Sequence, residues 1–408
     1  MKKKIVIIGN GFDIGHELPT KYLDLMFYIY DNDITFLKNL NEILFQSFEK
    51  ISGILYDDEP YVNREETELE KQVCKKDPKY NKDGTENRYY AALRNSCYLG
   101  DCGEFKCKIL WYIWNNLEKY LYLVFLENEV DAKEMEYNGI KETIEAEEIG
   151  QVCQMDIEQI DRPANDHLNK MMHLKTNFDV FINKWIYDID CSIKFFSDNI
   201  CNEKPKFSKY KEYKIFSKDY FSENDLIINF NYSKTIEYLY GINNVCHIHG
   251  ESSCSNKPIM GHTNDSIKSS YVYEVEHCID GIYYTEECAD DAYYLVKEFY
   301  KDYNSILTDN DCILQKCVNY DSISIIGMSY SETDFPYFKT IKEKLTKDAF
   351  WTLYYYSDED KSNAKKYQKC LGLDDSNSCI LNVENLFTNT VYLEEQSDSI
   401  NDRKNNVL

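Results

Sequence analysis

Four short segments of the chain carry small or polar residues directly after runs of β-branched and apolar residues. They are residues 8–13, 229–232, 247–250 and 326–334. They read Ile-Gly-Asn-Gly-Phe-Asp, Asn-Phe-Asn-Tyr, His-Ile-His-Gly and Ile-Gly-Met-Ser-Tyr-Ser-Glu-Thr-Asp. In an open parallel α/β sheet, ligands bind just outside the carboxyl ends of the strands. Four strand ends of this kind predict a nucleotide-binding crevice assembled from distant parts of the sequence.

The first segment supplies the candidate binding residues Gly9, Asn10, Gly11, Phe12 and Asp13. Glycines after a strand let the backbone approach a phosphate closely, although the third glycine of a full Gly-x-Gly-x-x-Gly motif is missing. A carboxylate repels phosphate, so we expect Asp13 to accept a hydrogen bond from a ribose hydroxyl or to cap the next turn. A tight turn with no ligand is the alternative.

The second segment places Asn229 and Asn231 on one side of a strand end, because side chains alternate along a strand. An amide offers two donors and an acceptor, which suits a water molecule or a ribose hydroxyl. Tyr232 completes this candidate set. The alternative is capping of the next helix, for which Ser233 is the better candidate.

The third segment ends a strand with His247 and His249, just before Gly250. Histidine can serve as a general base near neutral pH, so His249 is a candidate base and His247 a candidate binding residue. A satisfied core histidine is the alternative. A zinc site would need further ligands that the sequence does not place, so we predict no metal.

The fourth segment supplies backbone N–H groups and hydroxyls before a helix. Gly327, Ser329, Ser331 and Asp334 could seat a phosphate or a ribose at that helix N-terminus. Alternatively, Ser331 and Asp334 form a capping box.

The surrounding patterns predict an α/β protein with a Rossmann-like parallel sheet flanked by helices and a large, mainly helical insertion. Predicted strands cover residues 3–8, 226–228, 245–249, 322–326 and 350–356, with an edge strand at 391–393. Predicted helices cover about 19–30, 236–239, 331–345 and 358–371. Two apolar stripes, from Leu110 to Val124 and from Phe178 to Ile193, predict buried helices in between. The predicted division is a core of residues 1–30 plus 215–400, an insertion of 31–214 and a tail of 401–408.

Composition narrows the classes of partner. A net charge of −25 makes binding to duplex nucleic acid unfavourable. No apolar run approaches the length of a membrane span, so we expect a cytoplasmic protein that does not bind membranes. The 15 cysteines are then expected to be free thiols. Cys97, Cys102 and Cys107 are evenly spaced but lack a Cys-x-x-Cys pair.

Taken in order, these blocks resemble the AbiH family of bacterial phage abortive-infection proteins. The resemblance lies in Gly9 to Asp13 with His16 and residues 18–22, then in residues 229–232, Ile236-Glu237, 247–250, Gly261-His262 and 327–334. The helical middle matches loosely, around Trp114 and Leu117-Glu118. The resemblance implies an intracellular role in antiviral defence.

A more distant resemblance to sirtuin-like NAD-consuming domains implies a mechanism. By that analogy NAD is the substrate, Asn231 positions water or the nicotinamide ribose, and His249 is the general base. Asp13 stands where those domains have Ser, and Ser233 stands where they have Asp. The four-cysteine zinc ribbon of sirtuins is missing, which favours NAD glycohydrolysis over protein deacylation.

Three functional hypotheses follow. The first is a phage-defence effector that binds and hydrolyses NAD or a related nucleotide. The second is a nucleotide-binding sensor or scaffold without catalysis, and the third is a nuclease acting on tRNA or DNA. A phage or host protein as trigger, and a homo-oligomer, stay open as partners.

Overall fold

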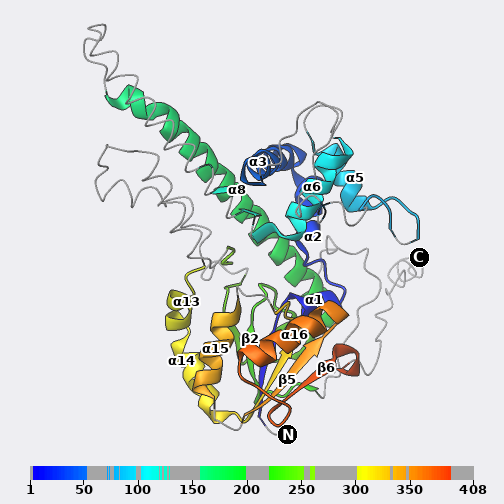
Figure 1. The fold of residues 1–408 in the computed structure, drawn as a ribbon, viewed down its shortest axis with the longest axis vertical. Helices are drawn as coiled ribbons and strands as arrows, with labels where there is room; N and C mark the ends of the chain where they lie inside the picture. Colours follow the sequence, from blue (N-terminus) through cyan, green and yellow to red (C-terminus); the bar gives the residue numbers. More distant parts are fainter. Residues whose placement is uncertain are drawn as a thin grey trace, which may run out of the picture. The chain divides into compact units, whose positions relative to one another are not determined.

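A computed structural model describes the chain in several stretches. These are residues 3–52, 71, 73, 78–81, 83–97, 103–118, 120, 121, 124, 125, 128, 157–198, 220–251, 258–261, 301–330, 334–345 and 349–386. The chain forms two compact units (Figure 1). The first consists of Met1–Lys21, Asn183–Pro258 and Asp302–Leu408, and the second of Tyr22–Ile182 and Ile259–Lys301. The division predicted from the sequence placed the boundaries between core and insertion near residues 30 and 214.

The first unit is built on one all-parallel sheet, as predicted. Within the described residues it has the strand order β3-β2-β1-β4-β5-β6. The strands are β1 (Ile5–Ile8), β2 (Leu226–Asn229), β3 (Val245–His247), β4 (Ser322–Ile326), β5 (Phe350–Tyr355) and β6 (Ser378–Asn382). This is the doubly wound order of dinucleotide-binding folds, and its topological switch point lies between β1 and β4.

Continuous apolar sequence explains the central strands. All four residues of β1 are fully buried, as expected for a strand covered on both faces of a parallel sheet. On one face Val6 and Ile8 join a core that includes Phe12, Ile227 and Ile236. Burial of one such aliphatic side chain contributes about 1.5–3 kcal/mol. The central strands are therefore held by packing from both sides.

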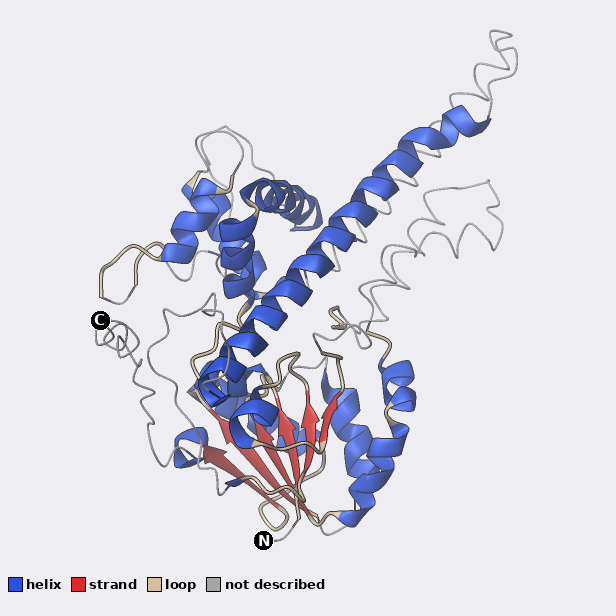
Figure 2. Cartoon of the chain, turned by 180° about the vertical axis from the view of Figure 1, so that it is seen from behind, coloured by secondary structure: helices blue, strands red, loops and turns tan. Residues whose placement is uncertain are grey.

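Helices lie between the strands of the first unit and after the last of them. They are α1 (Asn10–Gly15), α9 (Thr235–Tyr240), α13 (Tyr303–Asp309), α14 (Asp311–Leu314), α15 (Phe335–Lys344) and α16 (Asp358–Cys370), with the 3-10 helices η2 (Gln315–Asn319) and η4 (Val383–Leu386). Figure 1 shows α16 in front of the sheet, and Figure 2 shows the same sheet from behind. The strand arrows in Figure 2 point the same way, so their carboxyl ends share one edge.

The second unit is helical in its described part. It contains α2 (Tyr22–Asn32), α3 (Ile34–Ser52), α5 (Arg88–Asn95), α6 (Glu104–Asn115) and the beginning of α8 (Ile157–Asp198). Trp114 is fully buried, and its Nε1 donates to Asn41 Oδ1 over 2.8 Å. Phe178 is also buried, which confirms that both apolar stripes belong to the core. Among the helices described, none combines the length and apolar character that a bilayer crossing needs.

Most predicted elements are confirmed, with errors at their ends. The strand predicted at 245–249 ends at His247, and the helix predicted from Ser331 begins at Phe335. The sequence predicted a loop after the first strand, but α1 forms there, too short to show a helical period. The strand β6 was missed, and the predicted edge strand at 391–393 lies outside the described residues.

The contact between the turns after β1 and β4 depends on Gly327. Its backbone has φ +73°, and a Cβ at this position would lie 2.1 Å from the Phe12 amide nitrogen. Gly241 offers a matched comparison in the same unit, because it ends α9 at φ +69° and a Cβ there would have no atom within 4 Å. Left-handed backbone is therefore common to both positions, whereas steric overlap occurs only at Gly327.

We predict that Gly241→Ala lowers the free energy of unfolding by about 1–2 kcal/mol, the cost of a left-handed alanine. Gly327→Ala should lose a further 1–3 kcal/mol or so, because overpacking adds to the backbone cost. Urea unfolding of both variants measures the difference. Equal losses would contradict the steric argument.

Candidate functional site

The turn after β1 is hydrogen-bonded to the exit of β4, at the switch point of the sheet. Gly9 N donates to Ile326 O over 2.9 Å, and Gly11 N donates to Gly327 O over 2.8 Å. A Cβ on Gly11 would lie 2.7 Å from the Gly327 Cα, so close approach requires glycine here. The two amide groups of the predicted phosphate-binding turn are therefore bonded to the neighbouring strand exit.

Asp13 projects from α1 into a buried polar cluster at the ends of β1 and β2. Its side chain is 1% exposed. Ser233 Oγ donates to Asp13 Oδ2 over 2.5 Å, and the hydroxyls of Ser233 and Thr235 lie 3.0 Å apart. Among the described residues, no hydrogen-bond partner of Asp13 Oδ1 is found. One oxygen of this buried carboxyl is thus held by a hydroxyl pair.

Burial sets the protonation of Asp13. Burial raises the pKa of this carboxyl from 3.8 to about 6. The hydrogen bonds from Ser233 and Thr235 oppose that rise, and the charge of Glu237 adds to it. A carboxyl that titrates near pH 6 is suited to accept or release a proton under physiological conditions. Asp13 therefore has chemical capability beyond that of a turn cap.

The two asparagines after β2 join the ends of neighbouring strands. Asn229 Oδ1 accepts from the Asn231 amide nitrogen over 2.9 Å, and Asn229 Nδ2 donates to Ser233 O over 3.2 Å. Asn231 Nδ2 donates to Gly9 O over 3.0 Å, a contact between the exits of β1 and β2. The helix α9 begins after Lys234 without any side-chain cap, so the capping alternative for these residues is wrong.

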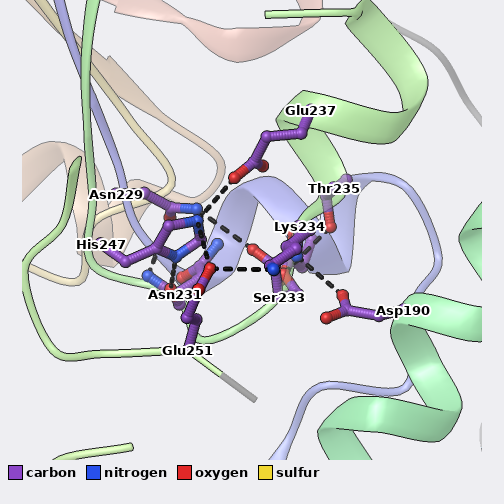
Figure 3. A network of polar contacts seen from close by, with 10 residues as sticks. Asp190, Asn229, Asn231, Ser233, Lys234, Thr235, Glu237, His247 and Glu251 are labelled. Carbon is purple, nitrogen blue, oxygen red and sulfur yellow. Dashed lines mark hydrogen bonds and ion pairs between the residues drawn. The ribbon is translucent and has the colours of Figure 1, made fainter. Parts of the chain in front are cut away.

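His247 lies at the end of β3 with both ring nitrogens in contact with acceptors (Figure 3). Its Nδ1 is 3.1 Å from Asn231 O, and its Nε2 is 2.7 Å from Glu237 Oε1. A carbonyl and a carboxylate can only accept, so both contacts are hydrogen bonds only when both ring nitrogens donate, as they do in an imidazolium. Burial lowers the pKa of His247, but Glu237, the Asn231 carbonyl and the Glu251 charge outweigh it and raise the pKa above 6.5.

Further charges surround this histidine. Glu251 Oε2 lies 3.9 Å from His247 Nε2 and 3.1 Å from Lys234 Nζ. The Lys234 backbone amide donates to Asp190 Oδ1 over 2.7 Å. Figure 3 shows these groups converging from α8, α9 and the loops that follow β2 and β3. Four carboxyl groups, counting Asp13, thus share the region with two cations.

His249 has different surroundings from His247. Its ring is 3% exposed and meets Phe230 and Tyr337 edge-on, with centroid distances of 5.1 and 5.4 Å. Because β3 ends at His247, the predicted alternation of the two histidines along one strand does not extend to His249. The candidate base His249 therefore lies among aromatic rings, although it is only two residues from His247 in the sequence.

The other predicted site residues are spread more widely. Phe12 belongs to the core, while Asn10 is exposed and donates through Nδ2 to Thr20 O. Tyr232 is half-buried and Ser329 is exposed. Asp334 precedes α15 without a side-chain cap, and Ser331 lies outside the described residues. The structure thus brings together Gly9, Gly11, Asp13, Asn229, Asn231, His247 and Gly327.

Several residues of the cluster were not predicted as site residues. Ser233, Thr235 and Glu237 follow the second segment within six residues, so proximity in sequence could have identified them. Asp190 and Glu251 carry no local signal, and only the fold brings Asp190 to Lys234. Tyr356, after β5, also lies near α1. The Tyr356 hydroxyl would be 2.6 Å from a Cβ on Gly15. Burial raises the pKa of Tyr356, and the negative charge of Asp13 adds to that rise.

His16 is a second buried ionisable group on this side of the sheet. Its Nδ1 lies 2.7 Å from Phe12 O and its Nε2 lies 2.6 Å from the Tyr240 hydroxyl. Burial lowers the pKa of His16 to about 4, so the ring is neutral and Nε2 accepts from Tyr240. In the part of the chain described, no group of three or more His, Cys, Asp or Glu side chains is arranged to hold a metal ion.

We predict a pH-dependent stability difference between wild type and Asp13→Asn. The pKa of Asp13 is higher in the folded state, so its protonation stabilises the fold. That contribution, about 3 kcal/mol for a two-unit shift, is fully present below pH 4 and is lost as pH rises through 6. The wild-type free energy of unfolding minus that of the variant should fall accordingly between pH 4 and 7. Urea titrations at fixed pH measure it, and a constant difference would contradict the assignment.

Comparison with known proteins places this arrangement in a family. A family model described as bacteriophage abortive infection AbiH matches residues 5–355, a range that includes all four segments and the polar cluster. No curated protein and no solved structure matches the chain. The match spans most of the sequence and runs through β5 of the sheet. The chain therefore belongs to the AbiH family of bacteriophage abortive infection proteins.

Proposed function

We propose that this phage-defence protein binds NAD or a related nucleotide at the carboxyl edge of its sheet and hydrolyses the bond between nicotinamide and ribose. The observation that carries the proposal is the convergence of strand ends beside the switch point. There Asn231, from the exit of β2, is hydrogen-bonded to the exit of β1, next to the Asp13 carboxyl. Doubly wound sheets bind dinucleotides at this place.

The charges of the cluster suggest how such a nucleotide lies. Asp13, Glu237, Glu251 and Asp190 outnumber the cations Lys234 and His247, so this side disfavours phosphate. It suits a ribose hydroxyl or the cationic nicotinamide ring. The pyrophosphate then belongs on the β4 side, near Gly327 and the amino end of α15.

The proposed chemistry needs charge stabilisation and an oriented water. Nicotinamide leaves as a neutral group while positive charge develops on the ribose, and the Asp13 carboxylate stabilises such charge above pH 6. Asn231 orients the water, whose oxygen bonds to the ribose carbon while His249 accepts its proton. General-base help of this kind is typically worth about 10²–10⁴-fold.

A second candidate function is a sensor that binds the nucleotide without cleaving it. The surroundings of His249 favour this alternative, because the ring is enclosed by Phe230 and Tyr337. In the turn after β1, the amide groups of Gly9 and Gly11 are also already hydrogen-bonded to the exit of β4, so they are not available to a phosphate in this arrangement. A phage or host protein that opens the site would then act as the trigger, for either function.

We predict that purified protein releases nicotinamide from NAD, as measured by chromatography. Asn231→Ala and His249→Ala should each lower turnover by about 10²–10⁴-fold because they remove the water-orienting amide and the base. His173→Ala is the matched control, since His173 is exposed on α8 in the helical unit. Thermal unfolding of each variant establishes that it is folded.

The outcomes separate the candidate functions. Turnover by folded His249→Ala at the wild-type rate would refute the base assignment. NAD binding without nicotinamide release, with or without phage protein added, favours the sensor. Cleavage of tRNA or DNA that depends on a divalent metal would favour a nuclease.

A further inference from the structure

His247, at the end of β3, contacts both the loop after β2 and the helix α9 that directly follows that loop. One ring nitrogen bonds the Asn231 carbonyl in the loop after β2, and the other bonds Glu237 on α9. Its side chain is 7% exposed, whereas those of Glu237 and Glu251 are 18% and 20% exposed. The ring is therefore enclosed, with its charge balanced by two carboxylates that reach solvent.

Asn231 is fixed by three of its polar groups. Its amide nitrogen donates to Asn229 Oδ1, its side-chain Nδ2 donates to Gly9 O, and its carbonyl oxygen accepts from His247 Nδ1. The first two contacts come from neutral amides. Only the third comes from a charged donor, and charge-assisted hydrogen bonds are roughly twice as strong as neutral ones.

We infer that His247, as an imidazolium, is the positioning residue of the site: it holds the Asn231 loop in place by donating both ring N–H groups, one to Asn231 and one to Glu237. This inference rests on the proposed function, in which Asn231 orients the attacking water. In this role His247 acts through Asn231 and not through a contact with the substrate. Its role differs from the nucleotide contact that the sequence predicted for it.

The two contacts differ in what happens when the ring loses a proton. A neutral imidazole has one N–H, and the Glu237 carboxylate 2.7 Å away retains it at Nε2. A lone pair on Nδ1 then faces the Asn231 carbonyl at 3.1 Å, and an attractive contact becomes a repulsive one. Deprotonation should therefore release the Asn231 loop while the Glu237 contact persists.

The charged groups around His247 determine the direction of its titration. Glu237 on α9 and Glu251 after β3 favour the imidazolium, and Lys234 partly offsets Glu251. Asp13 on α1 and Asp190 on α8 add negative charge to the same cluster, and Cys246 precedes His247 in β3. Because the pKa of His247 is raised, this pair of contacts, which we call the His247 clamp, persists to higher pH than with an unperturbed histidine and opens as pH rises through that pKa.

Two substitutions separate the contacts. In His247→Asn the side-chain amide lies where Nδ1 was and can still donate to Asn231. In His247→Gln the longer side chain places its amide where Nε2 was, so that only the contact with Glu237 is kept. We expect His247→Gln to lose at least tenfold more kcat for nicotinamide release than His247→Asn, with little difference in KM.

The pH profile gives a second readout. Wild-type kcat should fall as pH rises through the His247 titration, and His247→Asn should lack that fall because an amide does not titrate. Equal kcat losses in the two variants, or the same alkaline fall in His247→Asn, would overturn the inference.

Nuclear magnetic resonance separates this inference from the proposed function. Protein labelled with ¹⁵N-histidine and ¹⁵N-asparagine reports the charge of His247 and the environment of Asn231 without any substrate, with His247→Asn and Asn231→Ala used to assign the signals. We expect the Asn231 amide signals to shift with the His247 titration. If they do so in a protein that releases no nicotinamide, the proposed reaction fails and the clamp stands. If the Asn231 signals do not change as His247 titrates, the inference about His247 is wrong, whether or not the protein releases nicotinamide.

Discussion

The close approach of the turns after β1 and β4 is the constraint on which the site depends. Gly11 N bonds Gly327 O, and the Cα atoms at these positions leave no room for a side chain. This contact sets where α1 begins, and α1 carries Asp13 to Ser233 and Phe12 into the core. The glycines therefore act first as packing residues, and through that packing they place the carboxyl.

Sequence patterns could predict the centre of the sheet because the strands β1, β2 and β4 are buried on both faces. Such strands read as continuous β-branched runs, and their ends are marked by glycine, asparagine or histidine. The strand β6 escaped detection because its residues are mostly half-buried and its sequence, Ser-Cys-Ile-Leu-Asn, is mixed. The early helix α1 escaped because six residues do not show a period.

The site could be predicted only in part, for a related reason. Asn229, Asn231 and His247 stand at strand ends, where the sheet itself brings them together. Asp190 reaches the cluster from a long helix, and no spacing in the sequence relates it to Lys234. The sequence pattern also could not predict the different surroundings of the two histidines, because these depend on contacts with distant residues. His247 contacts the Glu237 carboxylate, whereas His249 contacts aromatic rings.

Three buried ionisable groups near this edge show how burial and hydrogen-bonding partners together decide charge. Burial disfavours the charged form of each. In His16, whose ring nitrogens contact the Phe12 carbonyl and the Tyr240 hydroxyl, burial prevails and lowers the pKa to about 4. His247 has Glu237 and keeps its proton. Asp13 has hydroxyl donors, which only partly oppose the effect of burial, and titrates near pH 6. The site therefore combines a histidine whose protonated form is favoured, on the β3 side, with a carboxyl that ionises above about pH 6, on the β1 side. Asn231 bonds His247 at the end of β3 through its backbone carbonyl and Gly9 at the exit of β1 through its side-chain amide, so the orientation of that amide depends on both strand ends.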